Sequence, residues 1–327
     1  MRNMDSSLPP LSVPAREVVV FAEGVTDGAE QARIRAVPGV TVEFFTDHQA
    51  LEDRVGEAHV VAGWLSPQGL ARATRLEWLQ SRAAGADFAL YPAMIASPVV
   101  LTSSKGNGAI PLAEHAIWLM LTLNRNAVRW IDAQREHRWN RFEHGELNGL
   151  TCGIIGLGNS GQDLAGKAKA FHMTVIGMRR TAVPVPGVDE VYPRGQLHEF
   201  LGRSDIVVVT APLTAETAGM LGAAEFRAMK QTALLIVGSR GGIADEQALL
   251  RALHEGWIAG AGLDSFWQEP LPADSPFWDA PNTIVTPHNG VTTHATWTRG
   301  NEIFIDNLYR FVKGEPLVNL VDKQAGY

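Results

Sequence analysis

The feature that most constrains this chain is a glycine-rich turn between an apolar segment and a helical one. The segment TCGIIGLG (151–158) runs into GLGNSG, which places Gly156, Gly158 and Gly161 in the spacing G-x-G-x-x-G. The first glycine permits a tight turn, the second lets the backbone approach a pyrophosphate, and the third lets helix and strand pack closely. A purely structural turn is the alternative, because glycines gather in any turn. The strand before it, the helix at 161–172 and the strand after that helix favour a dinucleotide site.

Short apolar segments alternate with helical ones along the whole chain. The strand-like segments of the first third are 16–24, 41–46, 59–65 and 98–104. Those after residue 150 are 151–158, 173–178, 205–212, 233–239, 259–266 and 283–288, and a final amphipathic helix is expected at 297–313. Near-continuous apolar strands separated by helices are typical of a parallel sheet covered on both faces.

This alternation predicts two Rossmann- or flavodoxin-like domains, each a doubly wound parallel sheet, with a cleft between them as the default ligand site. Residues 1–110 with 298–327 are expected to form a substrate-binding domain, and residues 111–297 a dinucleotide-binding domain. One long helix is predicted over 111–139, with Trp118, Trp130 and Trp139 as packing residues.

Composition and charge argue against several classes of function. The 327 residues carry a net charge of −7, whereas general nucleic-acid binding needs a basic face. Cys152 is the one cysteine, so the chain can form no internal disulfide or cysteine-rich site, and no metal is expected. No apolar run reaches the roughly 18–20 residues of a spanning helix, and residues 1–16 lack the apolar stretch of a signal peptide. Those residues are expected to form a frayed tail, and the protein to be cytoplasmic.

Two arginines follow the strand MTVIGM (173–178), where an acid would hold the ribose 2′-hydroxyl of NAD. Arg179 falls at the usual place of that acid, Arg180 comes next, and no acid occurs before Asp189. A carboxylate would repel a 2′-phosphate, whereas guanidinium groups can grip one with charge-assisted bonds. The arginines therefore favour NADP over NAD, with two solvated surface charges as the alternative.

Polar residues end three late strand-like segments, at the sheet edge where open α/β sheets bind ligands. They are Arg240 in LLIVGSRGG, Glu269 in GLDSFWQEPLP and His288 in TIVTPHNG. Each has an ordinary structural explanation when taken alone. Arg240 could cap a helix, Glu269 could be an exposed loop acid, and His288 could be a satisfied buried histidine.

Together these segments resemble the D-2-hydroxyacid dehydrogenase family. Its signature blocks match SRGGIAD (239–245), GLDSFWQEPLP (262–272) and TPHNG (286–290). Further matches are LAEHAIWLML (112–121), TAPLTAETAGML (210–221) and FRAMKQTALLIV (226–237), and the resemblance is weakest before residue 80. Ser265 and Asn289 depart from the family, which usually has Val at the first position and an apolar residue at the second. His294 is unusual as well, with a surface position at a helix start as its ordinary explanation.

The resemblance implies a catalytic role for each of the three polar residues. Arg240 would bind the carboxylate and carbonyl oxygen of the substrate, and Glu269 would orient His288. His288 would be the general acid in reduction and the base in the reverse direction, because both forms of a histidine are accessible near neutrality.

The resemblance also implies a binding role for two further sets of residues. Backbone N–H groups around Ala84, Gly85 and Ala86 would hold the substrate carboxylate. The cofactor would be lined by Gly156, Gly158, Asn159, Ser160, Gly161, Arg179, Arg180, Gly238, Ser239, Arg240, Asp264 and His288.

The expected function is therefore NADP(H)-dependent reduction of a small 2-keto acid, such as glyoxylate or hydroxypyruvate, to the D-2-hydroxy acid. A homodimer joined through residues 111–148 is expected from the same resemblance. The alternative is a cofactor-sensing binding protein, because corepressors of this fold keep the same three residues. Turnover of a small 2-keto acid would distinguish the two.

Overall fold

The computed structural model describes residues 17–326, which divide into two compact units. Unit 1 contains the described residues up to Asn107 together with those from Trp297 onward, and unit 2 is Gly108–Thr296. Residues 1–16, for which the sequence predicts a frayed tail, lie outside the described residues. No helix in the described part of the chain combines the length and the apolar character that crossing a membrane requires.

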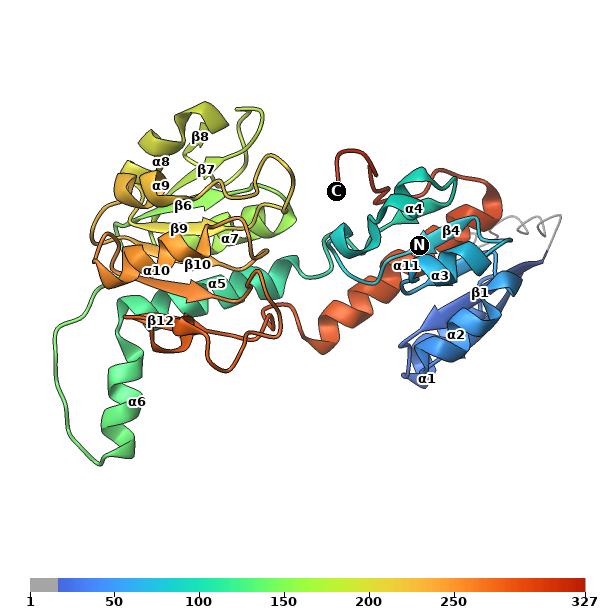
Figure 1. The fold of residues 1–327 in the computed structure, drawn as a ribbon, viewed down its shortest axis with the longest axis horizontal. Coiled ribbons are helices and arrows are strands. Elements are labelled where there is room, and N and C mark those ends of the chain that lie inside the picture. Colours follow the sequence, from blue (N-terminus) through green and yellow to red (C-terminus); the bar gives the residue numbers. More distant parts are fainter. Residues whose placement is uncertain (1–16, 327) are drawn as a thin grey trace, which may run out of the picture. The chain divides into compact units, whose positions relative to one another are not determined.

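Unit 1 is built on a five-stranded parallel sheet in the order β2-β1-β3-β4-β5 (Figure 1). This is the flavodoxin-like order, in which the chain reverses direction across the sheet between β1 and β3. Its strands are β1 (Val18–Glu23), β2 (Val40–Phe45), β3 (Val60–Ala62), β4 (Trp78–Gln80) and β5 (Val100–Thr102). Its helices are α1 (Gly28–Arg35), α2 (His48–Arg54), α3 (Pro67–Arg72), α4 (Pro92–Ala96) and most of α11 (His294–Lys313), with 3-10 turns at 55–57 and 87–89.

Alternating strand residues give unit 1 two apolar layers. Phe21, Val61 and Leu79 point to one face, where they pack with Leu51 of α2 and Met94 of α4. Val20, Val60 and Trp78 belong to the other face, which is covered by Ile34 of α1 and by Phe304 and Leu308 of α11. Because side chains alternate along a strand, three-residue strands are long enough to contribute to both layers.

Unit 2 is a seven-stranded parallel sheet in the order β12-β11-β10-β9-β6-β7-β8 (Figure 1). Counted from β6, this is the Rossmann order with one more strand, and the direction reverses between β6 and β9. Its strands are β6 (Thr151–Ile155), β7 (Thr174–Met178), β8 (Glu190–Tyr192), β9 (Ile206–Val209), β10 (Leu234–Val237), β11 (Gly260–Leu263) and β12 (Thr283–Val285). Its helices are α5 (Ala109–Asn124), α6 (Ala127–Arg135), α7 (Asn159–Ala170), α8 (Leu197–Arg203), α9 (Ala223–Ala228), α10 (Glu246–His254) and the start of α11, with 3-10 turns at 194–196 and 276–279.

The two faces of the unit 2 sheet are covered by different helices. Leu235 and Val237 of β10 pack in the cluster that contains Phe200 of α8 and Phe226 of α9. Leu234 and Ile236 of the same strand pack in the opposite cluster, with residues of α5 and α7. The prediction of parallel sheets covered on both faces is therefore confirmed.

The prediction of one long helix over 111–139 is wrong. Asn126 adopts a left-handed conformation (φ 48°, ψ 47°) and separates α5 from α6, and α6 ends at Arg135. Figure 1 shows α6 extending away from the sheet of its own unit. Of the three tryptophans, Trp130 packs on Phe142 at 5.0 Å between ring centroids, whereas Trp139 is 94% exposed.

Two short strands were not expected from the sequence. These are β4, in EWLQS, and β8, in DEVYP, and each has only three residues. A three-residue strand shows too little alternation to be recognised without its neighbours. His294 is exposed and is the first residue of α11, as its ordinary explanation requires.

Candidate active site

The glycine turn lies at the point where the unit 2 sheet reverses direction. Gly156 has φ +100°, and a Cβ on it would come within 2.6 Å of the backbone nitrogen of Ala211, which follows β9. A Cβ on Gly161 would lie 2.0 Å from the carbonyl oxygen of Gly156. Close contacts with the protein backbone therefore require glycine at these two positions. A Cβ on Gly158 would meet no atom within 4 Å, so the space beside it is open.

Helix α7 begins directly after Gly158, and no side chain caps its first turn. Asn159 is exposed and Ser160 is partly exposed in that turn. Uncapped N–H groups at a helix N-terminus, together with the helix dipole, are a ready site for phosphate. An open Gly158 beside an uncapped helix therefore fits the pyrophosphate of a dinucleotide.

The two arginines stand at the end of β7. The N–H of Arg179 donates to the carbonyl of Tyr192 at 3.2 Å, so the backbone continues the pairing of β7 with β8. Its side chain is partly exposed and makes no hydrogen bond or ion pair with the described residues. Arg180 is exposed. The Arg179 guanidinium is thus available at the sheet edge that carries the glycine turn.

His288 and Glu269 form a hydrogen-bonded pair. His288 Nδ1 lies 2.8 Å from Glu269 Oε2, and Glu269 Oε1 accepts from the N–H of Phe266 at 2.9 Å. About a third of each side chain is exposed, at 34% and 36%. His288 has φ 50°, which is uncommon for a residue with a side chain, and its N–H donates to the carbonyl of Thr286 at 3.0 Å. One ring nitrogen is therefore held, and Nε2 has no partner among residues 17–326.

The loop that carries His288 is tied to Asp264 at the end of β11. Asp264 Oδ1 accepts from Thr286 Oγ1 at 2.6 Å and from the N–H of Asn289 at 2.9 Å. Its Oδ2 accepts from the N–H of Gly290 at 2.9 Å. The side chain is only 1% exposed, and its carboxylate fixes the histidine loop. That Asp264 also lines the cofactor stays a prediction.

His115 of α5 joins this network and was missed by the sequence reasoning. Its Nε2 lies 3.1 Å from Thr286 Oγ1 and 3.5 Å from Asp264 Oδ1. A Cβ on Gly290 would lie 2.8 Å from Asp264 Oδ2 and 3.1 Å from the His115 ring. The sequence offered one signal for this role: His115 is a polar residue within the largely apolar run LAEHAIWLML.

The turn after β10 carries Gly238, Ser239 and Arg240. Arg240 is half-buried, and its Nη1 donates to the carbonyl of Ser239 at 2.8 Å. The Arg240 side chain lines a small pocket with Ser265 and Phe266, which follow β11. The neighbouring strands β10, β11 and β12 thus bring Arg240, Glu269 and His288 to one edge of one sheet. In residues 17–326, no group of three or more His, Cys, Asp or Glu side chains could hold a metal ion.

The predicted substrate loop belongs to unit 1 and follows β4. Ala84 is exposed, Gly85 is partly exposed, and Ala86 is buried. The N–H groups of these three residues donate to no acceptor among the described residues. Three consecutive N–H groups without a partner in the chain can bind an anion such as a carboxylate.

Other side chains gather at the same edge of unit 1. His48 stacks on Trp64 with 3.8 Å between ring centroids, and its Nδ1 lies 3.1 Å from Glu23 Oε1. Tyr91 donates from its hydroxyl to the carbonyls of Leu65 (3.1 Å) and Ser66 (3.3 Å), and burial raises the pKa of Tyr91 to about 12. Of these groups, the indole of Trp64 is the one left substantially exposed, at 43%.

Two doubly wound sheets, a glycine turn at one reversal point and a histidine–carboxylate pair at the same edge define a dinucleotide-dependent dehydrogenase. Residues 117–290 match the family model described as "D-isomer specific 2-hydroxyacid dehydrogenase, NAD binding domain". The chain belongs to the D-isomer specific 2-hydroxyacid dehydrogenase family, and it is an oxidoreductase.

Relatives of known activity and structure agree with this assignment. A glyoxylate reductase of Korarchaeum cryptofilum is 36% identical over 236 residues, which cover 69% of this chain and 70% of that protein. A solved family protein from Aeromonas salmonicida is 32% identical, with a TM-score of 0.86 over 94% of this chain and all of that one. The NADPH-dependent glyoxylate/hydroxypyruvate reductase of Sinorhizobium meliloti, solved with NADP and sulfate, is 30% identical, with a TM-score of 0.83 over 95% of this chain and all of that one.

Proposed function

We propose that this enzyme reduces a small 2-keto acid to the D-2-hydroxy acid with NADPH as the hydride donor. Unit 2 is then the cofactor-binding domain and unit 1 the substrate-binding domain. Glyoxylate and hydroxypyruvate are the first substrates to test, because the similar enzymes named above act on them. The observation that carries the proposal is the His288–Glu269 pair at 2.8 Å, at the edge that also carries the glycine turn.

The residues of unit 2 fit a bound NADP. The open Gly158 and the uncapped N-terminus of α7 would hold its pyrophosphate. Arg179, with no partner in the described chain, would bind the 2′-phosphate, and Arg180 would add a second positive charge. The bound nicotinamide supplies or accepts the hydride. Of the two nicotinamide cofactors, NADP is favoured because the strand end offers guanidinium groups and no acid.

Two sets of groups would bind the substrate. The three unbonded N–H groups of Ala84, Gly85 and Ala86 would hold the substrate carboxylate. Arg240 would contribute a fixed positive fork to the carboxylate and the carbonyl oxygen. A positive charge beside that oxygen favours the negative charge that develops there during reduction.

His288 would donate the proton that the carbonyl oxygen acquires. Nδ1 is occupied by Glu269, so the proton for the substrate comes from Nε2. Through the same hydrogen bond, Glu269 would hold the orientation of the ring. Asp264 and His115 would act indirectly, because they fix the loop that carries His288.

The proposal is tested by steady-state assays with 2-keto acids of increasing size, each with NADPH and with NADH. We expect turnover of glyoxylate and hydroxypyruvate, with kcat/KM higher for NADPH than for NADH. Tight cofactor binding without turnover of any 2-keto acid would support the cofactor-sensing alternative and overturn the proposal.

We also propose that the enzyme is a homodimer joined through residues 111–148. Trp118 (47%), Val128 (46%), Ile131 (47%) and Trp139 (94%) leave large apolar groups exposed along this segment. Exposed apolar residues concentrated in one segment are typical of an interface. Light scattering of the purified protein tests this: twice the chain mass is expected, and a monomer at all concentrations would contradict it.

A further inference from the structure

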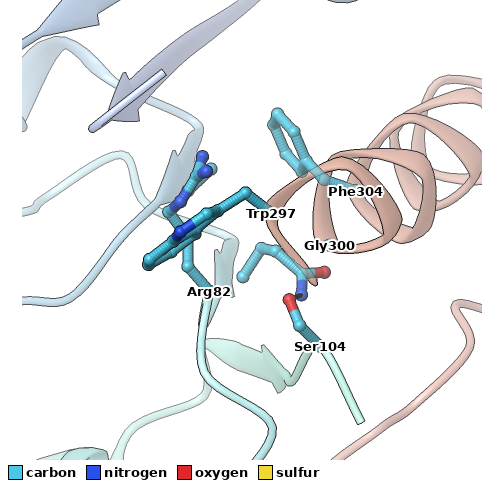
Figure 2. A pocket seen from close by; sticks show the side chains of 7 residues that line it. Arg82, Ser104, Trp297, Gly300 and Phe304 are labelled. Atoms are coloured by element: carbon cyan, nitrogen blue, oxygen red, sulfur yellow. Dashed lines mark hydrogen bonds between the residues drawn. The ribbon is translucent and has the colours of Figure 1, made fainter. Parts of the chain in front are cut away.

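Unit 1 contains a small pocket at the carboxyl edge of three neighbouring strands. Ala62 ends β3, Gln80 ends β4 and Ser104 follows β5, and all three line the pocket. Its opposite wall comes from α11, through Trp297, Gly300 and Phe304 (Figure 2). The carboxyl edge of a parallel sheet is where ligands bind in folds of this type.

Arg82 is the charged residue of this pocket. Figure 2 shows it reaching from the loop after β4 towards the indole of Trp297, with the guanidinium carbon 5.7 Å from the ring centroid. Its Nη2 donates to Asn301 Oδ1 at 3.1 Å, which is its one hydrogen bond within the described chain. No carboxylate of the described residues lies within the 4.0 Å of an ion pair with it.

Burial without an ion pair is costly for a guanidinium. Burial lowers the pKa of Arg82 from its usual value, and the more distant Glu23 opposes this effect only in part. Glu23 is itself engaged by His48, at 3.1 Å from Nδ1. Two other polar side chains of the pocket are bonded within the protein, because Gln80 Nε2 and Ser104 Oγ both donate to the carbonyl of Ser81. Arg82 thus gives the pocket charged hydrogen-bond donors that are not all used within the described chain.

The pocket is distinct from the three N–H groups of residues 84–86, which do not line it. An anion on Arg82 would therefore be separate from the carboxylate that those N–H groups are proposed to hold. The pocket volume of about 10 Å³ corresponds to roughly one water-sized group, so only the end of a ligand would enter it. A group that is small, negative and planar matches a guanidinium best, and a carboxylate meets all three conditions.

We propose that Arg82 binds a second carboxylate of the substrate, so that the preferred substrates are 2-keto acids with an acid group at each end. This inference rests on the proposed function and narrows its substrate class. Trp297 restricts the guanidinium from one side and Asn301 holds one of its nitrogens, which leaves the remaining donors for the ligand.

The test compares matched substrates of equal chain length. 2-Oxoglutarate is compared with 2-oxopentanoate, and oxaloacetate with 2-oxobutanoate, each with NADPH. We expect kcat/KM of the wild type to favour the diacid in at least one pair by about tenfold or more, the scale of a hydrogen bond to a charged group. Arg82→Met should remove most of that preference through KM, and Arg82→Lys should retain part of it. Arg33→Met, at an exposed arginine of α1, is the control and should keep the wild-type ratio.

Equal efficiency for diacid and monoacid in the wild type would overturn this inference and leave the proposed function standing. An equal loss of kcat/KM for diacid and monoacid in Arg82→Met would assign Arg82 a structural role, and this result would also overturn the inference. If no keto acid is turned over, the proposed function fails, and the pocket is tested by thermal stabilisation with 2-oxoglutarate. A larger rise in melting temperature with 2-oxoglutarate than with 2-oxopentanoate, lost in Arg82→Met, would support the site. No such difference between the two ligands would overturn the inference.

Discussion

The carboxyl edges of the two parallel sheets differ in how far their polar groups are bonded within the protein. In unit 2 the proposed catalytic pair is held by bonds within the protein: Glu269 is bonded to His288, and Asp264 is bonded to the loop that carries His288. In unit 1, hydrogen-bond donors lack acceptors in the described chain. The N–H groups of residues 84–86 have none, and the Arg82 guanidinium has one. The comparison teaches that the histidine pair of unit 2 is fixed by its protein partners, whereas the donors of unit 1 would be completed by the ligand. Changes to the pair and its loop should therefore reduce the rate, and changes to the unit 1 donors should reduce substrate affinity.

The largest effect is expected for His288→Ala. Loss of a general acid should lower kcat by roughly 100-fold or more, because no other group in the pair can supply the proton. NADPH affinity should be little changed. Stopped-flow or steady-state rates and fluorescence titration of NADPH measure the two quantities separately, and full activity in this variant would assign the acid to another residue.

Gly161 and Gly158 offer a matched pair within the cofactor site. Gly161→Ala places a methyl group 2.0 Å from the carbonyl of Gly156, which should cost about 1–3 kcal/mol of stability as the backbone shifts. Gly158→Ala meets no protein atom within 4 Å, so its melting temperature should stay close to that of the wild type. Both variants should bind NADPH more weakly. Unchanged NADPH affinity in Gly158→Ala would mean that the open space there is not occupied by the cofactor.

Asp264→Asn tests the bonds that hold the histidine loop. Both carboxylate oxygens of Asp264 accept hydrogen bonds, whereas the amide nitrogen of asparagine can accept none, so at least one bond is lost. We expect kcat to fall by about tenfold, with a smaller change in the KM of the keto acid. His115→Phe should lower kcat in the same direction by less, since it removes one contact to the same network. A change confined to NADPH affinity would support the predicted place of Asp264 in the cofactor lining and contradict this role.

Arg179→Asp should produce the smallest change in overall rate and act on cofactor choice. The aspartate would repel the 2′-phosphate and could accept from the ribose hydroxyl, so the NADPH-to-NADH ratio of kcat/KM should fall by about tenfold or more. Arg180→Asp serves as the comparison, with a smaller shift expected at the exposed neighbour. An unchanged ratio in Arg179→Asp would make the arginine an ordinary surface charge.

The sequence predicted unit 2 better than unit 1 for a physical reason. The glycine turn is recognisable because its spacing restricts residue type, and Arg240, Glu269 and His288 were assigned by the resemblance of the blocks that carry them. The break at Asn126 depends on one left-handed residue, and the sequence around it is compatible with a continuous helix. The roles of Asp264 and His115 arise from contacts between α5, β11 and the loop after β12, and such long-range contacts leave no periodic signal.

The same reasoning explains what was missed in unit 1. β4 has three residues, so its strand character comes from pairing with β3 and β5 more than from its own pattern. Arg82 lies shortly after that strand, and from the sequence it looks like a surface charge, because α11, which contacts it, is distant in sequence. The expected loop at 84–86 was located by resemblance, and its unbonded N–H groups became visible only in the structure.

The most direct test of the account is product analysis with hydroxypyruvate and NADPH. Wild-type enzyme should form D-glycerate, one molecule for each NADPH oxidised, and His288→Ala should bind NADPH but form product at a rate lower by roughly 100-fold or more. Formation of L-glycerate, or NADPH bound without any keto acid being reduced, would contradict the assignment of this site to D-2-hydroxy acid formation.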